Sequence, residues 1–354
     1  MTTPTFFLTA APRMRPAFTC VHAVLCLLAL AFSASAASAA ATPLRAGMIG
    51  LDTSHVPAFV KLFNDPAAAG DLAGIRIVAA YPGGTDMPAS RNRVARFTET
   101  VRAAGVEIVS SIPQLLEKVD VVFLESVDGR IHLQEATPVI LAGKPLFIDK
   151  PAAGTLADAV AIYDLARKHN VPCFSSSSLR FVPGVRELSK KAELGKITGA
   201  LSWGPCDYEP GTPDLFFYGI HGVEPLFALM GMGCESVSRL HTDDVDVVSG
   251  VWKDGRVATY RGFRRAKGGF GLVAFGTDSF AQAPAGSLGG YRELCLEIAR
   301  FFKTRTVPVS PEETLEVLAF MEAADESKRQ GGKPVTLASV LAKARKDASA
   351  RVGQ

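Results

Sequence analysis

The ten residues AGKPLFIDKP at positions 142–151 decide the fold of this chain. Gly143 follows an apolar helical pattern over residues 131–141 and is the residue type that commonly ends a helix. The run 146–148 is short and wholly apolar, which is typical of a strand buried in a parallel sheet. Asp149 and Lys150 follow it, and Pro151 stops further pairing. The alternatives are a solvated strand end or a ligand site, because open α/β sheets bind ligands at this edge.

Around this stretch, strand patterns alternate with helical patterns from residue 44 to residue 175. The repetition predicts an α/β fold with a Rossmann-type, doubly wound parallel sheet over residues 42–174. The expected strands are 44–50, 75–81, 106–109, 121–125, 146–148 and 171–174, and the expected helices are 56–63, 91–104, 131–141 and 156–169.

After residue 174 the pattern changes to alternating strands joined by turns, which predicts a second α/β domain with an open, mainly antiparallel sheet over residues 175–310. Its expected strands are 197–203, 236–241, 245–252, 257–263 and 271–275, with a helix over 215–230. Amphipathic helices are expected at 291–303 and 311–329, and residues 311–354 are assigned to C-terminal helices.

The first 41 residues have the organisation of a signal peptide. Arg13 and Arg15 form a basic segment, residues 17–32 an apolar one, and residues 33–41 are small. The apolar segment is short for a membrane span, although an uncleaved anchor is the alternative. We therefore expect an exported protein, periplasmic or secreted, without stable membrane insertion after processing.

The net charge and the cysteine content limit which classes of partner and metal site can be expected. Without the two N-terminal arginines, the net charge falls from +3 to about +1, which argues against nucleic acid as the main partner. Four cysteines remain, at positions 173, 206, 234 and 295, and they lack metal-ligand spacing. No metal site is predicted, and a disulfide cannot be assigned from the sequence.

The first strand ends in GLDTSH at positions 50–55, where a dinucleotide fingerprint would read G-x-G-x-x-G. Gly50 matches the first glycine, but Asp52 and His55 replace the other two. Thr53 and Ser54 could donate hydroxyls to an anion at the helix N-terminus. Alternatively, Asp52, Thr53 or Ser54 caps an ordinary helix.

Two further strands end in residues that could contact a cofactor. Tyr81 ends the second strand, where dinucleotide-binding domains place an acid that holds the adenosine ribose. Glu125 ends the fourth strand and could contact a ribose or a substrate hydroxyl, or be a satisfied buried acid.

The Asp149-Lys150-Pro151 sequence resembles the Glu-Lys-Pro signature of the glucose-fructose oxidoreductase/inositol dehydrogenase (Gfo/Idh/MocA) family, with Asp149 in place of glutamate. The resemblance covers residues 43–337. It implies NAD or NADP as cofactor, bound through a fingerprint that is degenerate at Asp52 and His55. It also implies that Lys150 orients a substrate hydroxyl, and that the open sheet forms a homo-oligomer surface.

A second segment, residues 214–224, resembles the family's helix of substrate-facing residues. His221 and Glu224 match it, whereas Phe217 replaces an aspartate. On a helix, Tyr218, His221 and Glu224 would share one face. The resemblance implies catalytic roles for Lys150, His221 and Tyr218 and substrate contacts from His221 and Glu224. Arg180 resembles a family arginine that faces the cofactor, and could instead form an interdomain ion pair.

Together these features predict a divergent, exported oxidoreductase that transfers a hydride between NAD(P) and a sugar or cyclitol hydroxyl. The expected cofactor contacts are Gly50, Thr53, Ser54, Tyr81, Glu125, Lys150 and Arg180. One alternative is cofactor-assisted cleavage of a glycosidic bond without net redox. Another is a non-catalytic carbohydrate-binding protein built on a Rossmann frame, which the replacements at Asp52, Tyr81 and Phe217 favour.

Overall fold

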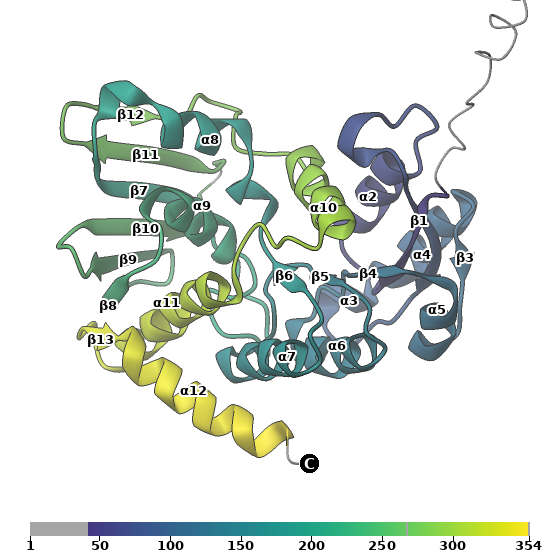
Figure 1. The fold of residues 1–354 in the computed structure, drawn as a ribbon. Helices are drawn as coiled ribbons and strands as arrows, with labels where there is room; N and C mark the ends of the chain where they lie inside the picture. The colour runs from purple at the N-terminus through teal and green to yellow at the C-terminus, as the bar shows by residue number, and fades with distance from the viewer. Residues whose placement is uncertain (1–41, 267, 353–354) are drawn as a thin grey trace, which may run out of the picture. The chain divides into compact units, whose positions relative to one another are not determined.

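The computed structural model describes residues 42–266 and 268–352, so the predicted signal peptide lies outside the described residues. Residues 43–354 form one compact unit. Within it the chain builds two sheets, each covered by helices (Figure 1). No helix in the described ranges is long and apolar enough to cross a membrane.

The first sheet has six strands in the order β3-β2-β1-β4-β5-β6, and all its pairings are parallel. Every residue of β4 and β5 is buried, because both faces of a central parallel strand are covered by helices. The predicted Rossmann-type sheet is therefore confirmed. The strands are β1 (Leu44–Ile49), β2 (Ile75–Tyr81), β3 (Glu107–Ile108), β4 (Val121–Leu124), β5 (Leu146–Ile148) and β6 (Cys173–Ser175).

Two apolar cores cover the faces of this sheet. One face packs a cluster of phenylalanines, including Phe59, Phe123 and Phe147, against the first helix and the helix that begins at Arg292. The other face packs against three later helices and continues into the second half of the molecule. The helices and short 3₁₀ turns of this half are α2 (His55–Phe63), η1 (Gly70–Leu72), α3 (Pro88–Arg91), α4 (Val94–Ala103), α5 (Ile112–Lys118), η2 (Gly129–Ile131), α6 (His132–Leu141) and α7 (Leu156–Lys168).

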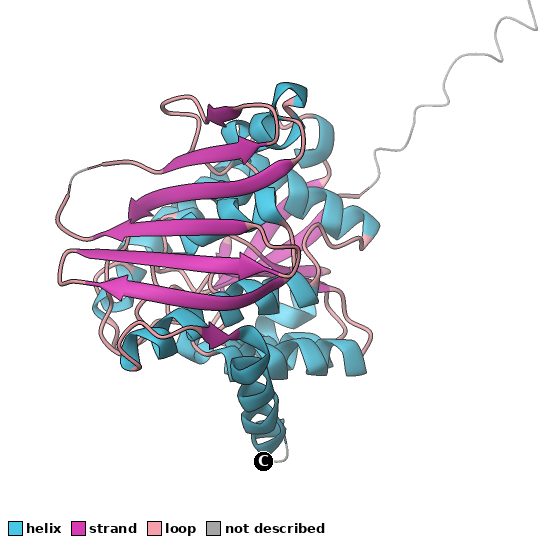
Figure 2. Cartoon of the chain, turned by 90° about the vertical axis from the view of Figure 1, so that its left-hand side faces the viewer, coloured by secondary structure: helices cyan, strands magenta, loops and turns pink. Residues whose placement is uncertain are grey.

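The second sheet has seven strands in the order β12-β11-β7-β10-β9-β8-β13. Only the β7–β10 pairing is parallel, so the predicted mainly antiparallel sheet is confirmed. Burial alternates along β7, β9 and β10 because one face meets helices and the other is open (Figure 2). The strands are β7 (Ile197–Pro205), β8 (Cys234–His241), β9 (Val245–Trp252), β10 (Val257–Phe263), β11 (Gly271–Gly276), β12 (Phe280–Gln282) and β13 (Val335–Thr336).

The remaining helices follow β6 along the chain, and only η3, α8 and η4 lie between the two sheets in sequence. Ser310 caps α11 by accepting a hydrogen bond from the backbone N–H of Glu313 at 3.1 Å. The four cysteines of the described residues are all buried and free. The remaining helical elements are η3 (Ser178–Arg180), α8 (Pro183–Lys190), η4 (Ala192–Leu194), α9 (Ile220–Met230), α10 (Arg292–Thr304), α11 (Pro311–Arg329) and α12 (Leu337–Val352).

Candidate functional site

A pocket of about 340 Å³ lies at the carboxyl edge of the first sheet, against the segment that leads into α9. Its volume is at the lower end of the range for small-molecule sites. It brings together five of the predicted site residues, namely Thr53, Ser54, Lys150, Tyr218 and His221. The other lining residues are His55, Arg93, Val127, Ser178, Leu179, Asp207, Phe217, Phe270, Leu288, Gly289, Gly290 and Tyr291.

Lys150 follows β5 and is buried beside this pocket. Its Nζ donates a hydrogen bond to the backbone carbonyl of Phe217 at 3.2 Å and lies 5.8 Å from the ring centre of Tyr218. Burial lowers the pKa of Lys150, and the neighbouring charge of Arg93 lowers it further, while Asp149 opposes the shift. Lys150 therefore gives up its proton more readily than a surface lysine does.

His221 lies in the first turn of α9 and faces the same pocket. Its Nδ1 is 2.7 Å from the Ser177 hydroxyl, which fixes the ring orientation. Burial and the nearby Lys150 charge lower the pKa of His221 well below its usual value. The imidazole is therefore neutral at neutral pH and can accept a proton.

Tyr218 stands in a turn and not on the predicted helix over 215–230, because α9 begins only at Ile220. Gly219 lies where an added Cβ would come within 2.9 Å of the Leu215 carbonyl, so the chain is tightly folded there. The shared helical face expected for Tyr218, His221 and Glu224 is therefore wrong. The Tyr218 ring nevertheless lies 5.0 Å from that of His221.

Arg180 and Glu224 form a buried ion pair at 2.7 Å and are not among the residues that line the pocket. Arg180 also pairs with Glu313 of α11, and Glu224 accepts a hydrogen bond from the backbone N–H of Ser177 at 3.3 Å. The sequence offered two roles for Arg180, a cofactor contact or an interdomain ion pair. In the structure Arg180 forms ion pairs, with Glu224 and Glu313. Glu224 supports the segment that orients His221.

The turn after β1 begins at Gly50, which has φ +82°, and an added Cβ would lie 2.4 Å from the backbone nitrogen of Ser126. Only glycine fits this turn. The Leu51 N–H donates to the carbonyl of Pro82 at 2.8 Å, and Gly83 passes directly over Gly50. The chain itself therefore occupies backbone donors that a pyrophosphate would use in a dinucleotide-binding turn.

Asp52 is completely buried and caps no helix. Its carboxylate accepts hydrogen bonds from the Ser90 hydroxyl at 2.6 Å and from the Val127 N–H at 2.8 Å. Burial raises its pKa, which these bonds oppose. Asp52 thereby holds α3 against the ends of β1 and β4. In this conformation the Asp52 carboxylate and the Leu51 N–H are bound to Ser90, Val127 and Pro82, so a dinucleotide at this turn would compete with these hydrogen bonds.

Tyr81 and Glu125 also lie outside the lining of the pocket. Tyr81 ends β2 and its carbonyl accepts a hydrogen bond from the Gly50 N–H at 3.0 Å. Glu125 follows β4 and is completely buried. Burial, with the nearby charges of Asp149 and Asp52, raises the pKa of Glu125 well above its usual value.

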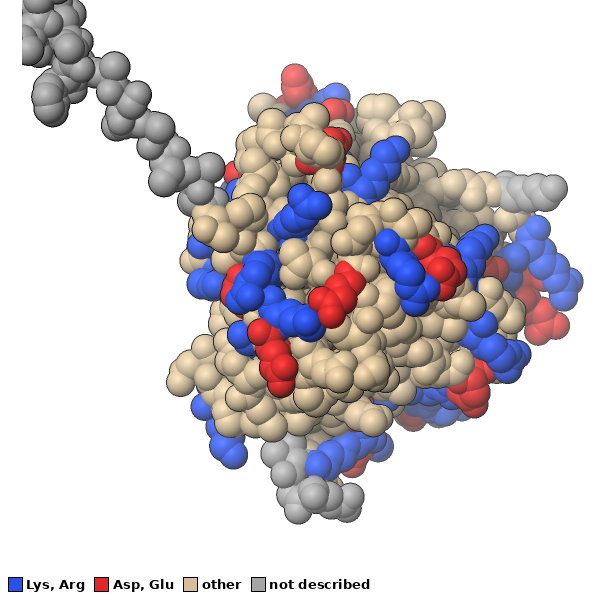
Figure 3. Space-filling view, turned by 90° about the vertical axis from the view of Figure 1, so that its right-hand side faces the viewer, with Lys and Arg blue, Asp and Glu red and all other residues tan. Residues whose placement is uncertain are grey.

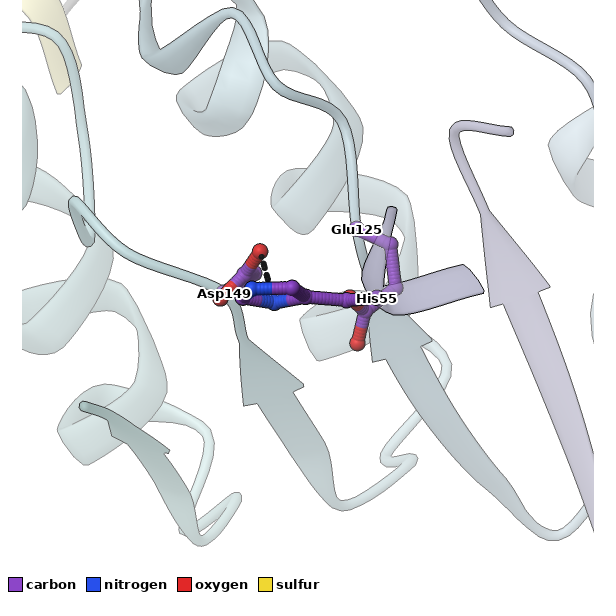
Figure 4. A group of neighbouring side chains, drawn as sticks. All are labelled: His55, Glu125 and Asp149. Atoms are coloured by element: carbon purple, nitrogen blue, oxygen red, sulfur yellow. Dashed lines mark ion pairs between the residues drawn. The ribbon is translucent and has the colours of Figure 1, made fainter. Parts of the chain in front are cut away.

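His55, Glu125 and Asp149 form a buried cluster that the sequence analysis did not identify (Figure 4). His55 Nδ1 lies 2.8 Å from Asp149 Oδ2 and 4.0 Å from Glu125 Oε2. Burial opposes the ionisation of Asp149, but the adjacent His55 holds its pKa below the usual value. A signal for this cluster was present in the sequence, since all three residues follow strands that are neighbours in a Rossmann sheet.

Other lining residues were also missed. Arg93 lies in the turn between α3 and α4, inside the stretch predicted as one helix over 91–104, and Asp207 and Phe270 come from loops that carry no recognisable pattern. Tyr291 precedes α10, and its hydroxyl lies 3.2 Å from that of Ser54. These positions depend on how distant loops meet, which local sequence does not encode.

Comparisons with known proteins agree with this fold. Residues 86–177 match the oxidoreductase family with an NAD-binding Rossmann fold, Gfo/Idh/MocA. A search of curated proteins gave no match. The match spans η2, β4, β5 and the Asp149-Lys150-Pro151 signature.

Three solved structures share the fold over most of their length. Scyllo-inositol dehydrogenase from Lactobacillus casei, with bound NAD(H) and scyllo-inositol, is 16% identical with a TM-score of 0.68, over 84% of this chain and 99% of that one. Myo-inositol dehydrogenase from the same organism, in complex with NAD(H) and myo-inositol, is 17% identical with a TM-score of 0.67, over 83% and 96%.

The third is an oxidoreductase from Agrobacterium radiobacter in complex with NAD+, L-tartaric acid and magnesium. It is 14% identical with a TM-score of 0.67, over 85% of this chain and 100% of that one. Identities this low establish the fold alone. Similarity to the Gfo/Idh/MocA oxidoreductases with an NAD-binding Rossmann fold is therefore shown for residues 86–177, and likeness of fold for most of the chain.

Proposed function

We propose that this protein oxidises or reduces a hydroxyl group of a sugar or cyclitol, with NAD(P) as the hydride carrier. The observation that carries the proposal is that Lys150 and His221 line one pocket although they belong to different halves of the molecule. Burial lowers the pKa of Lys150 from its high usual value, which favours proton transfer, and it keeps the His221 ring neutral, so that a ring nitrogen can act as an acceptor.

The residues of the chain supply proton transfer and orientation, whereas the nicotinamide cofactor supplies the hydride acceptor or donor. His221, held by Ser177, accepts a proton at its other ring nitrogen. Lys150, held by the Phe217 carbonyl, binds the reacting oxygen and shares the proton. The Tyr218 ring lies beside both. Phe217 and Phe270 restrict the entry of water from the α9 side.

A small polyhydroxylated substrate suits this lining. Ser54, Arg93, Asp207 and Tyr291 surround the pocket with donors and acceptors, and its volume admits one small ring. Two neighbours of the same fold were crystallised with inositols.

The surface charge does not favour nucleic acid as a partner. On the face shown in Figure 3, Lys and Arg side chains are interspersed with Asp and Glu, so that face has no uniformly positive field of the kind that binds a phosphate backbone.

A second candidate is a carbohydrate-binding protein without catalysis. The specific observation that favours it is the closed turn at Gly50, where Asp52 binds the Ser90 hydroxyl and the Leu51 N–H binds the carbonyl of Pro82. Such a protein would keep the pocket at Lys150 for a ligand and would not bind a dinucleotide.

Dinucleotide titration separates the two candidates. The full chain is titrated with NAD+, NADH, NADP+ and NADPH by calorimetry, with and without a panel of inositols and hexoses. Binding of a dinucleotide, with turnover of one polyol, supports the oxidoreductase. Binding of a polyol without any dinucleotide supports the non-catalytic candidate.

Two further properties belong to this proposal. We propose export, with processing close to residues 39–41, supported by the order of basic, apolar and small residues. N-terminal sequencing of the exported product should begin between residues 40 and 43, whereas a full-length, membrane-retained chain would contradict it.

We also propose self-association through the open face of the second sheet (Figure 2). Large apolar side chains are exposed on its strands, and exposed apolar patches commonly mark interfaces. Light scattering over a range of concentrations should show a dimer or larger species, and a monomer throughout would contradict it. The exposed residues are Leu240, Val251, Val257, Phe275 and Phe280.

A further inference from the structure

Three potential metal ligands meet under the floor of the pocket, at the ends of three neighbouring strands. His55 follows the turn after β1, Glu125 follows β4 and Asp149 follows β5, and these strands are adjacent in the sheet. One ligand atom from each lies within 4.8 Å of the others. Figure 4 shows the His55 ring beside Asp149, with Glu125 reaching in from the end of the next strand.

The buried carboxyl group of Glu125 is the feature that indicates a missing ligand. Its side chain is completely buried, and neither carboxylate oxygen has a hydrogen-bond partner among the described residues. An unpaired buried polar group is costly, and a carboxylate is the costliest kind. A proton on one oxygen would remove the charge, but its hydroxyl would still lack an acceptor. A cation that bridges to Asp149 would satisfy both carboxylates.

The nearest lysine does not fill this role. Lys150 is next to Asp149, but its Nζ points to the carbonyl of Phe217 on the pocket side. Only the backbone N–H of Lys150 contacts the cluster, donating to Asp149 Oδ1 at 2.8 Å. Asp52 adds a further carboxylate nearby, although the Ser90 hydroxyl and the Val127 N–H already bind it. The cluster therefore holds more carboxyl groups than cationic side chains, which adds to the effect of burial in raising the pKa of Glu125.

The donor set and its spacing suit one class of ion. An imidazole nitrogen and two carboxylate oxygens favour zinc or a similar divalent transition metal over calcium or magnesium, which prefer oxygen alone. With metal–ligand distances of about 2.1 Å, tetrahedral ligands are about 3.4 Å apart. The observed separations of 2.8 Å and 4.0 Å lie on either side of this value, so small side-chain rotations would complete the site.

We propose that His55, Glu125 and Asp149 bind one divalent transition-metal ion of the zinc type beneath the pocket floor. Only His55 of the three lines the pocket. The ion would therefore join the ends of β1, β4 and β5 and fix the His55 ring beside Tyr291, whose ring centre is 4.6 Å away. Two carboxylates and a neutral imidazole around a divalent ion leave the buried site without net charge. This proposal does not depend on the proposed hydride transfer.

The test measures metal uptake by the full chain, so it has a readout separate from activity. The purified chain is stripped with a chelator and titrated with Zn²⁺ by calorimetry, and its metal content is measured by mass spectrometry. We expect one Zn²⁺ per chain and a melting temperature that rises by about 5 °C at a hundredfold excess over the dissociation constant. Glu125→Gln and His55→Gln should each weaken binding by about 100-fold.

Matched variants identify the ligands. Glu135→Gln changes another buried carboxylate beyond the cluster, and His169→Gln an exposed histidine, so both should bind Zn²⁺ as the unmodified chain does. With Co²⁺ in place of Zn²⁺, the spectrum should show nitrogen and oxygen ligands and no thiolate charge-transfer band, because the four described cysteines are outside the cluster. A stripped chain that takes up no ion, undiminished binding in both ligand variants, or a thiolate band would each overturn the proposal.

Discussion

The Nζ of Lys150 donates a hydrogen bond to the backbone carbonyl of Phe217 at 3.2 Å. This bond joins the end of β5 to the turn before α9, so it connects the two walls of the pocket. His221 follows four residues after Phe217 and faces the same space. Lys150 and His221 therefore line one pocket only because the two halves of the chain pack together.

The first prediction is that Lys150 and His221 act as a unit. Lys150→Ala and His221→Ala should each lower turnover by about 100-fold, the lower end for general acid–base catalysis. The double variant should be little worse than either single one, because groups that act together give non-additive losses. Steady-state kinetics measure this, with the exposed Lys190→Ala as control. Losses that multiply would show that the two residues act separately.

The second prediction concerns the closed turn at Gly50. Asp52→Gly removes a buried carboxylate and releases Ser90, so it should tighten NAD(P) binding by about tenfold, the equivalent of one charge-assisted hydrogen bond. Ser90→Ala keeps the carboxylate and should produce a smaller gain. Calorimetric titration compares the variants. Weaker binding in Asp52→Gly would mean that Asp52 is needed for the site.

The third prediction is a pH dependence of stability at Glu135. Burial raises the pKa of this carboxyl to about 7, while a 2.6 Å hydrogen bond from Ser126 opposes the shift. Because the folded state holds this proton more tightly, the free energy of unfolding should fall as pH rises from about 4.5 to about 7, by roughly 3 kcal/mol. Urea denaturation between pH 5 and 8 measures the change.

Glu135→Gln should abolish that contribution, since an amide does not titrate. The variant should gain stability relative to the unmodified chain as pH rises to 8. Glu235→Gln, at an exposed position, should follow the unmodified chain throughout. Parallel curves for Glu135→Gln and the unmodified chain would show that Glu135 does not cause the pH dependence.

The fourth prediction concerns the buried Arg180–Glu224 pair. Arg180→Leu leaves Glu224 without its buried cation and should cost about 3–5 kcal/mol of unfolding free energy. Arg180→Leu combined with Glu224→Leu should recover much of this loss. Arg186→Leu removes a half-exposed pair with Glu297 and should cost about 1 kcal/mol or less. Equal costs for the two single variants would contradict the assigned burial.

Much of this fold could be predicted from local pattern. Fully apolar runs such as 146–148 identify buried parallel strands, and alternation along 245–252 identifies a half-covered antiparallel strand. The sequence pattern predicts a helix from residue 215, because the apolar residues at 215–217 continue the helical pattern, but they lie in a tight turn before Gly219 and α9 begins at Ile220. There, tertiary packing overrides local preference.

The site was only partly predictable for the same reason. Lys150 and His221 stand in recognisable segments, so resemblance located both. In the sequence, His55 is marked only because it replaces the third glycine of the dinucleotide fingerprint. Its partners Glu125 and Asp149 are 70 or more positions away along the chain. Asp52 reads in the sequence as a replaced fingerprint glycine or a helix cap, whereas in the structure it binds Ser90 of α3, a short helix that the sequence pattern does not predict.

The most direct test of the central claim is NAD(P)-linked turnover in the full chain. The chain is incubated with NAD+ or NADP+ and each of a panel of inositols and hexoses, and the absorbance of the reduced nicotinamide is followed. The account predicts reduction with at least one polyol, at a rate that falls by about 100-fold in Lys150→Ala and is unchanged in Lys190→Ala. A chain that binds a polyol, but neither binds nor reduces either dinucleotide, would contradict it.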